Sequence, residues 1–432
     1  MSKPRRNGSA TTANHRGRPD LCIVGGAGRV GLPLALTFAG RGRRVVIYDI
    51  NAKALEVIRR GTVPFMEAGA EALLQRVLAE QRLSFTTNPA DSAGVEAHIV
   101  IIGTPIDEFF NPKHRDLARA VDPLVPFLTA RQLVVLRSTV YPGTTEWLDR
   151  HFRSAGVRPS VAFCPERVVE GRVIEELQTL PQIVSGVTPE AEDRAARLFS
   201  CIAPHVVRLR PMEAEFAKLF CNSYRYIQFA ATNQFYMIAN SAGLDYYRIL
   251  QGMQQDYPRL RDLPRAGFSA GPCLLKDTMQ LTAFYDNEFS LGYTAMLINE
   301  GLPLYVVQQL ARVQDLTTKT VGLLGMAFKA DIDDPRASLS YKLKRVLEMR
   351  AKRVLTADPY VRDPELAPVK RVIAESDLLI LCAPHRLYRS LNLRGKPVID
   401  IWNFFGRGGR VPGDAAPAKA ARAPRRRARV RA

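Results

Sequence analysis

Short apolar runs alternate with longer amphipathic stretches in the first part of the chain. The run Leu21–Val24 leads into a glycine loop and a small-residue helix at Leu32–Gly40, and a second run follows at Val45–Tyr48. Two further apolar runs, His98–Ile102 and Leu133–Leu136, are separated by helical stretches. This alternation of strands and helices predicts an α/β fold with a doubly wound parallel sheet.

The rest of the chain shows a helical pattern and then a repeat of the first pattern. Residues 211–255 and Leu291–Val313 carry long helical patterns without strands between them. Three later segments repeat the order of the first part, as a run into glycine, a run ending in an acid and a run ending in proline: Val321–Gly325, Val354–Asp358 and Asp377–Pro384. An order that occurs twice predicts two Rossmann-like domains joined by a helical region.

The pattern divides the chain into five segments. A chain of 432 residues, 47% of them hydrophobic, rarely folds around one core. We expect a first Rossmann domain over residues 20–208, a central helical domain over 209–314 and a second Rossmann-like domain over 315–412. The two ends, residues 1–19 and 413–432, lack apolar periodicity and are expected to be disordered.

Charge and cysteine content change this picture little. The formal net charge is +19, and much of the excess lies in the two ends. The Arg-rich C-terminal end could contact nucleic acid or a membrane surface, but no aromatic residue stands among its charges, so a solvated tail is the favoured interpretation. The six cysteines show no CxxC, which favours reduced thiols over disulfides, and no metal site is expected. Because the sequence has neither a secretory signal nor an apolar run of membrane-spanning length, we expect a cytoplasmic location.

The first loop carries a dinucleotide-binding pattern. Residues Gly26–Gly31 read GAGRVG, fit GxGxxG and stand between a strand and a helix, as the pattern requires. Asp49 ends the second strand, 23 residues after Gly26, where a carboxylate accepts from both ribose hydroxyls and repels a 2′-phosphate. NAD is therefore the expected cofactor, in preference to NADP. The residues expected to bind it here are Gly26, Gly28, Arg29, Val30, Gly31 and Asp49.

A cysteine segment carries the main chemical signal. It reads GFSAGPCLLKD, with Cys273 ahead of a helical run at Leu274–Phe284. A thiol at the start of a helix, with Lys276 one turn on, is expected to be nucleophilic. Taken alone, the segment would be better interpreted as a buried structural cysteine.

Together with other motifs, this segment resembles the UDP-glucose/UDP-N-acetylmannosamine dehydrogenase family. The resemblance covers roughly residues 20–412 and leaves only the two ends outside it. Its marks stand in the family's order: Gly26–Gly31, Gly103–Pro105, Ser138–Thr144, Cys164–Arg167 with Glu170 and Gly171, Lys218 with Asn222, Gly271–Asp277, and Phe328–Lys329 with Asp334 and Arg336.

The resemblance implies that two NAD oxidise a sugar C6 alcohol to a carboxylate, with Cys273 as the nucleophile. A thiolate can trap the intermediate aldehyde as a thiohemiacetal, which a second oxidation turns into a thioester that water hydrolyses. The resemblance also implies that Lys218 and Asn222, at i, i+4 spacing on one helix face, hold the developing oxyanion. Without it, these two residues could be a solvated helix face.

The same resemblance implies the remaining site roles. Asp277 would orient a water or Lys218, and Thr139 would help to bind that water. Glu166 would be the general base for hydrolysis, although alone it is as well explained as a helix-start carboxylate after Pro165. Further contacts with NAD are implied for Thr104, Pro105, Thr139, Glu170, Lys276 and Arg336. Contacts with the UDP-sugar are implied for Glu166, Arg167, Val168, Lys218, Asn222, Tyr257, Arg259, Gly267 and Lys329.

The helical region predicts a homodimer or a larger homo-oligomer. Its large apolar side chains point in several directions, so that one core face does not cover them all. They are Phe216, Phe220, Tyr224, Tyr226, Phe229, Phe235, Tyr236 and Met237. In the resembled family, an arginine matching Arg259 reaches the neighbouring subunit's sugar nucleotide, although the spacing from Tyr257 to Cys273 departs from the UDP-glucose branch.

The stretches CPERVVEGRVIEELQTLPQIV and GFSAGPCLLKDTMQL look closer to the N-acetylhexosamine branch of the family than to the UDP-glucose branch. The expected substrate is therefore UDP-N-acetylmannosamine, followed by UDP-N-acetylglucosamine and UDP-glucose, with the uronate used in polysaccharide biosynthesis. Two other hypotheses remain open. A two-electron β-hydroxyacid-type dehydrogenase would not need Cys273, and a non-catalytic NAD-binding sensor or nucleic-acid-binding protein would never produce NADH.

Overall fold

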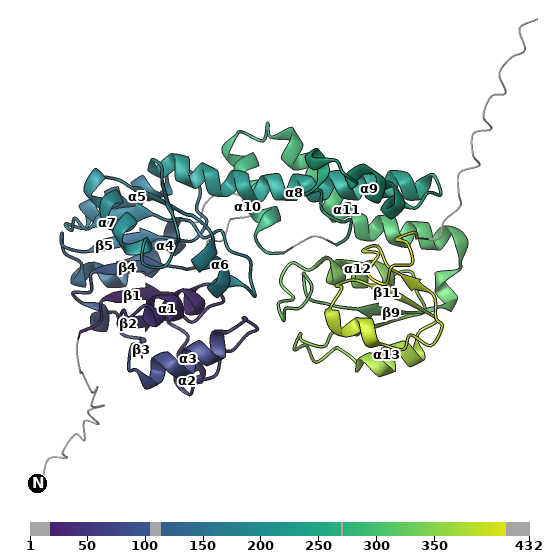
Figure 1. Cartoon of the computed structure of the whole chain (residues 1–432), viewed down its shortest axis with the longest axis horizontal. Coiled ribbons are helices and arrows are strands. Elements are labelled where there is room, and N and C mark those ends of the chain that lie inside the picture. Colours follow the sequence, from purple (N-terminus) through teal and green to yellow (C-terminus); the bar gives the residue numbers. More distant parts are fainter. Residues whose placement is uncertain (1–17, 104–113, 269–270, 412–432) are drawn as a thin grey trace, which may run out of the picture. The chain divides into compact units, whose positions relative to one another are not determined.

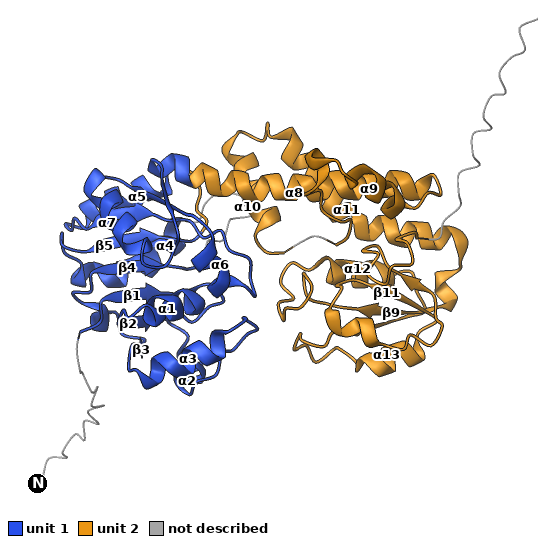
Figure 2. Cartoon of the chain, in the orientation of Figure 1, with its two compact units in different colours: residues 1–104, 114–138, 143–214 blue, residues 105–113, 139–142, 215–432 orange. Residues whose placement is uncertain are grey.

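A computed structural model describes residues 18–103, 114–268 and 271–411. These residues form two compact units, drawn blue and orange in Figure 2. Unit 1 comprises residues 18–103, 114–138 and 143–214. Unit 2 comprises residues 139–142, 215–268 and 271–411. The expected disorder of the two ends concerns residues that lie, apart from 18 and 19, outside the described ranges.

Unit 1 is built on an eight-stranded sheet in the order β3-β2-β1-β4-β5-β6-β7-β8. Strands β1 to β5 are labelled in Figure 1. The strands are β1 (Leu21–Val24), β2 (Val45–Tyr48), β3 (Leu83–Thr86), β4 (Ala97–Val100), β5 (Leu133–Leu136), β6 (Ser160–Phe163), β7 (Gln182–Gly186) and β8 (Val206–Arg208). Neighbouring strands are parallel except β6 and β7, which are antiparallel. The predicted parallel sheet is thus confirmed for its first six strands, and the antiparallel pair departs from it.

The helices of unit 1 follow the strands as a doubly wound sheet requires. They are α1 (Gly31–Gly40), α2 (Ala52–Arg59), α3 (Ala70–Ala79), α4 (His114–Val121), α5 (Thr144–Ser154), α6 (Val173–Thr179) and α7 (Pro189–Phe199), with 3₁₀ turns η1 (Pro89–Ser92) and η2 (Asp122–Phe127). Strands β1, β2, β4 and β5 are buried along their whole length, which explains their continuous apolar sequences. The small residues of α1 let it pack closely, and residues 31–39 are all buried.

Unit 2 combines a helical segment with a second sheet. Its helices are α8 (Pro211–Ser241, with its first residues in unit 1), α9 (Tyr246–Gln254), α10 (Leu274–Phe284), α11 (Ser290–Val313), α12 (Leu339–Glu348) and α13 (Val369–Glu375), with 3₁₀ turns η3 (Pro258–Leu260), η4 (Leu316–Thr318) and η5 (Arg386–Ser390). Its strands are β9 (Thr320–Leu324), β10 (Arg353–Ala357), β11 (Leu378–Leu381) and β12 (Val398–Ile399). All pairs are parallel, in the order β10-β9-β11-β12.

The second sheet repeats the centre of the first, because β10-β9-β11-β12 has the topology of β2-β1-β4-β5. The predicted pair of Rossmann-like sheets with a helical region between them is therefore confirmed. One core joins the helices of unit 2 to its sheet, with Tyr236 and Val306 in the same cluster as Leu323 and Ile380. The segments 209–314 and 315–412 thus share one hydrophobic core. Among the described residues, no helix is long and apolar enough to cross a membrane.

Candidate active site

The glycine loop of unit 1 is shaped for a pyrophosphate. A Cβ at Gly31 would lie 2.7 Å from Gly25 O and from Gly26 Cα, so only glycine lets the helix pack this closely. A Cβ at Gly28 would meet Gly25 O at an ordinary 3.8 Å, and Gly28 is exposed. The loop opens directly into α1, whose first turn carries no acid. These features leave room for an anion at a helix N-terminus, where the backbone dipoles favour it.

Asp49 follows β2 and lies beside this loop. Its Oδ2 accepts a hydrogen bond from the Ala27 amide (2.9 Å), and its Oδ1 accepts one from the Asn51 amide (2.9 Å). The carboxylate is thus held at the carboxyl end of the strand, where a dinucleotide's ribose is bound. Loop, helix and acid together fit NAD. The expected contacts Thr104 and Pro105 lie outside the described residues.

Glu166 is held by a buried arginine that our sequence analysis missed. Arg137 follows β5 and has no exposed surface, and its Nη2 lies 2.6 Å from Glu166 Oε2. Its Nη1 donates to Cys164 O (3.1 Å) and to Gln182 Oε1 (3.0 Å). Glu166 Oε1 accepts from the amides of Arg167 and Val168. Glu166 therefore lies in a turn after β6 rather than at a helix start, and its carboxylate is braced on both oxygens.

Glu170 lies four residues further along the same loop and pairs with the glycine loop. Its Oε1 is 3.0 Å from Arg29 Nη1, and the Arg29 guanidinium lies 5.4 Å from the centre of the Phe65 ring. Unit 1 thereby brings together Arg29 and Glu170, which are implied NAD contacts. The side chain of Arg167 points elsewhere, since its guanidinium donates to Pro181 O.

Unit 2 brings together Asn222 from α8 and Asp277 from α10. Asn222 Nδ2 donates to Asp277 Oδ2 at 2.6 Å, and Asp277 is completely buried. Lys218 lies one turn before Asn222 and is also buried, which rules out a solvated helix face for the pair. Lys276 Nζ lies 3.3 Å from Asp277 Oδ1. The hydrogen bond that joins Asp277 to α8 is thus the one from Asn222.

Cys273 is the N-cap residue of α10, and it is exposed. Its carbonyl accepts the Asp277 amide (2.9 Å) in the first turn of the helix. By contrast, Cys22, Cys164 and Cys382 are buried, and burial raises the pKa of the Cys22 and Cys164 thiols to about 12. An exposed thiol at a helix start is the arrangement expected for a nucleophile rather than for a core cysteine.

The segment that bears Cys273 packs closely on the second sheet's loops. A Cβ at Gly267 would lie 2.4 Å from the Trp402 ring, and one at Gly271 would lie 2.8 Å from the Phe328 ring. The Gly267 amide donates to Asn233 Oδ1 (2.9 Å). These two glycines, which both precede Cys273, are therefore required by aromatic neighbours far along the sequence.

The nucleotide contacts implied for the second sheet lie in the loop after β9. Lys329 is half-buried, and Arg336 is exposed and forms a two-pronged contact with the buried Asp334 carboxylate. Asp358, which follows β10 as Asp49 follows β2, accepts from the Met326 and Ala327 amides.

Asp358 contacts a histidine, His385, that the sequence did not indicate as its partner. His385 Nε2 lies 3.0 Å from Asp358 Oδ2, and His385 Nδ1 accepts from the Asp331 amide. Despite its burial, the Asp358 carboxyl has a pKa lowered to about 2, because His385 and the Tyr360 and Val361 amides favour its ionised form. The Asp358 carboxylate is thus already bound by groups of the second sheet's own loops.

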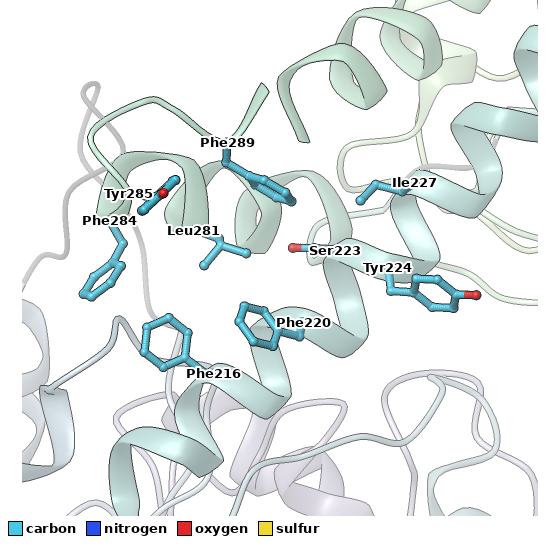
Figure 3. Close-up of a pocket in the computed structure, with 9 residues that line it drawn as sticks. All are labelled: Phe216, Phe220, Ser223, Tyr224, Ile227, Leu281, Phe284, Tyr285 and Phe289. Atoms are coloured by element: carbon cyan, nitrogen blue, oxygen red, sulfur yellow. The ribbon is translucent and has the colours of Figure 1, made fainter. Parts of the chain in front are cut away.

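The resemblance also implies contacts for Thr139 and Arg259. Thr139 is half-buried in unit 2, and Arg259 in η3 is exposed with its guanidinium 5.9 Å from the Tyr257 ring centre. An apolar pocket of about 440 Å³ lies between α8, α10 and the segment that joins α10 to α11 (Figure 3). It is lined by Phe216, Phe220, Ser223, Tyr224, Ile227, Leu281, Phe284, Tyr285 and Phe289. A sugar nucleotide needs several polar partners, so this pocket does not suit one.

Three domain models of the UDP-glucose/GDP-mannose dehydrogenase family match the chain. The NAD binding domain matches residues 20–203, the central domain residues 212–301 and the UDP binding domain residues 322–407. The matches therefore cover the first sheet, the helical segment and the second sheet.

Individual relatives span nearly the whole chain. The UDP-N-acetyl-D-mannosamine dehydrogenase of Pyrococcus horikoshii is 29% identical over 399 residues, covering 88% of this chain and 94% of that protein. The enzyme of the same name from Yersinia pestis is 28% identical over 397 residues, covering 85% and 94%. The solved structure of a UDP-glucose dehydrogenase from Pyrobaculum islandicum has a TM-score of 0.84 and 28% identity, covering 94% of this chain and 99% of that one.

Proposed function

Because the chain belongs to the UDP-glucose/GDP-mannose dehydrogenase family, and so is an NAD-dependent nucleotide-sugar dehydrogenase, we propose that it oxidises a UDP-sugar C6 alcohol twice. The observation that carries this proposal is the exposed Cys273 thiol at the start of α10, in the same helix as the buried Asp277 that holds Asn222. A two-electron oxidation to the aldehyde has no use for a nucleophile, whereas in a four-electron oxidation to the acid a thiol keeps the aldehyde bound for the second hydride transfer.

The proposed reaction takes the sugar C6 carbon from alcohol to carboxylate in four steps. The alcohol loses a proton and a hydride to become an aldehyde, and the Cys273 thiolate adds to the aldehyde carbon to form a thiohemiacetal. Loss of a second hydride and a proton gives a thioester, and water then breaks the carbon–sulfur bond to release the carboxylate and the thiol. When bound, NAD supplies the hydride acceptor for each oxidation. Unit 1 binds NAD through the residues 26–31 and Asp49.

The polar residues of the two units serve these steps in different ways. Lys218 and Asn222 would donate to the oxyanion of the thiohemiacetal, with Asn222 oriented by Asp277. Glu166 would accept the proton of the hydrolytic water, with Thr139 helping to bind it. The buried guanidinium of Arg137 lies 2.6 Å from Glu166 Oε2 and holds the carboxylate in position.

The substrate proposed first is UDP-N-acetylmannosamine. Both relatives described above carry that substrate in their names, although the similar Pyrobaculum structure is a UDP-glucose dehydrogenase. UDP-glucose and UDP-N-acetylglucosamine are therefore the alternatives. The product would be a nucleotide uronate for polysaccharide biosynthesis, and a reaction that needs a reduced thiol suits the cytoplasm.

We also propose a homodimer formed through the helical segment. Phe220, Tyr224, Phe235 and Ile238 follow one another at spacings of 4, 11 and 3 residues, which place them on one stripe of α8, and all four are exposed. Tyr226 and Tyr236 on another face of α8 are buried. A second apolar face that its own unit leaves exposed suits a two-fold contact with an identical helix.

The pocket in Figure 3 belongs to the same apolar surface, since Phe220 and Tyr224 of this stripe line it. A surface that is both apolar and hollowed supports the proposed dimer contact. Exposed apolar side chains also follow one face of α11, at Tyr293, Leu297 and Leu304. Arg259, which is exposed, would then be available to a neighbouring subunit's substrate.

The test of the proposed function is NADH formation with a panel of nucleotide sugars. UDP-N-acetylmannosamine should give the highest kcat/KM, and Cys273→Ser should abolish formation of the uronate. Cys201→Ser is the matched control, since Cys201 is also exposed but lies in unit 1 after α7. A higher kcat/KM with UDP-glucose would favour the alternative substrate. Unimpaired uronate formation by Cys273→Ser would contradict the thiol mechanism.

A further inference from the structure

Arg29 lies in the glycine loop and forms an ion pair with Glu170. It belongs to the glycine loop, beside Gly28, at which the pyrophosphate of NAD approaches the backbone. Its Nη1 lies 3.0 Å from Glu170 Oε1, and both side chains are mostly buried, with 21% and 16% of their surfaces exposed. A pyrophosphate at this loop therefore arrives next to a guanidinium that already faces a carboxylate.

Glu170 is held in this position by bonds of the surrounding backbone. The Val169 amide donates to Glu176 Oε2 (2.7 Å), and the Ala68 amide donates to Gly171 O (3.3 Å). The Ile174 amide donates to Glu67 Oε1 (3.1 Å). The loop that carries Glu170 is thus tied to α6 and to the segment before α3, so the backbone of Glu170 stays beside the glycine loop when the Arg29 side chain turns away.

We propose that Glu170 competes with the pyrophosphate of NAD for Arg29. When NAD binds, the Arg29 guanidinium moves from Glu170 to the pyrophosphate oxygens, and when the dinucleotide leaves, Glu170 takes the guanidinium back. A guanidinium is attracted by both groups, and phosphate and carboxylate suit its planar fork equally in geometry. The competition weakens NAD binding and speeds its release.

Fast release of the dinucleotide matters for the two proposed oxidations. Of this inference, only the link to catalysis rests on the proposed function. Two oxidations on one sugar require the first NADH to leave and a second NAD to enter while the sugar is still bound to Cys273. A carboxylate that competes with the pyrophosphate for Arg29 facilitates this exchange.

The test measures binding of ADP-ribose by titration calorimetry, because ADP-ribose keeps the pyrophosphate of NAD but lacks the nicotinamide and so accepts no hydride. Wild type, Glu170→Gln, Arg29→Met and the double variant are compared at low and high salt. Glu192→Gln is the matched control, since Glu192 also pairs with an arginine of unit 1, Arg208 (2.8 Å), but lies on α7. The same titrations with NADH, with its release followed by stopped flow, extend the test to the cofactor.

Glu170→Gln should bind ADP-ribose about fivefold more tightly at low salt, because an ion pair of this kind is worth on the order of a fivefold change. Arg29→Met should weaken binding about tenfold, as expected for one charge-assisted contact with phosphate. In the Arg29→Met background, Glu170→Gln should improve binding by less than about twofold, and Glu192→Gln should change nothing.

Unchanged or weaker binding by Glu170→Gln would overturn the proposal. An equal gain with and without Arg29 would also overturn it, because it would indicate simple repulsion between Glu170 and the pyrophosphate. Neither result depends on sugar oxidation. A failure of this inference is therefore distinguishable from a failure of the proposed function, which would show as absent uronate formation with ADP-ribose binding intact.

Discussion

Replacing Arg137 by methionine should strongly destabilise unit 1. The side chain is completely buried, and its guanidinium contacts Glu166 Oε2 (2.6 Å), Cys164 O (3.1 Å) and Gln182 Oε1 (3.0 Å) and lies 5.0 Å from the Phe199 ring centre. Methionine keeps much of the apolar contact but removes the charge, which leaves the Glu166 carboxylate without its cation.

The magnitude follows from this burial. Removing one partner of a buried ion pair costs about 3–5 kcal/mol, and the Glu166 side chain, with 12% of its surface exposed, places the loss near the lower end, at ~3 kcal/mol. For a unit of this size, 1 kcal/mol lowers Tm by about 2–4 °C, so the expected decrease is roughly 6–12 °C. The double variant Arg137→Met/Glu166→Gln should recover part of the loss, because the uncompensated charge is gone.

Differential scanning calorimetry of the full chain without cofactor measures this shift. The control is Arg208→Met, which removes an ion pair with Glu192 and Asp193 from an arginine side chain that is 49% exposed. Its Tm should change by less than about 2 °C. Two results would contradict a stabilising ion pair between Arg137 and Glu166. One is a Tm shift for Arg137→Met no larger than that of the control, and the other is a double variant less stable than the single one.

Three further predictions follow from the cofactor loop, the C-terminal end and the proposed dimer. Asp49→Ala should lower the ratio of kcat/KM for NAD to kcat/KM for NADP, because the carboxylate that repels a 2′-phosphate is gone. Equal use of both cofactors by the wild type would contradict this role of Asp49. Deletion of residues 414–432, outside the described ranges, should leave kcat nearly intact, and a large loss would refute a solvated tail. Inactive Cys273→Ala and Arg259→Ala proteins, co-refolded, should regain part of the activity; no recovery in proven heterodimers would place Arg259 in its own subunit's site or in none.

The local elements of the fold could be predicted because each depends on a short stretch of sequence. Strands β1, β2 and β5 have the bounds that their apolar runs predict, and the glycine loop stands between β1 and α1. The antiparallel direction of β7 could not be predicted, because it is set by pairing with β6 rather than by its own residues. The short α6 that joins them does not return the chain to the other end of the sheet.

Site residues could be predicted where a motif shows them and not where their partner is distant. The segment around Cys273 and the pair Lys218 and Asn222 are visible in the sequence. Arg137 follows an apolar strand and resembles an ordinary strand end, because its partner Glu166 stands 29 residues later. Likewise, Gly267 is visible as a glycine, but its contact with Trp402 depends on the packing of unit 2.

The most direct test of the account is the number of NADH formed per molecule of sugar consumed. Limiting UDP-N-acetylmannosamine is converted to completion with excess NAD, NADH is read by absorbance, and the sugar product is identified by mass spectrometry. The four-electron mechanism predicts two NADH and one uronate per sugar, since the Cys273 thiol retains the aldehyde for a second oxidation. One NADH per sugar, with an aldehyde or ketone as the product, would contradict it.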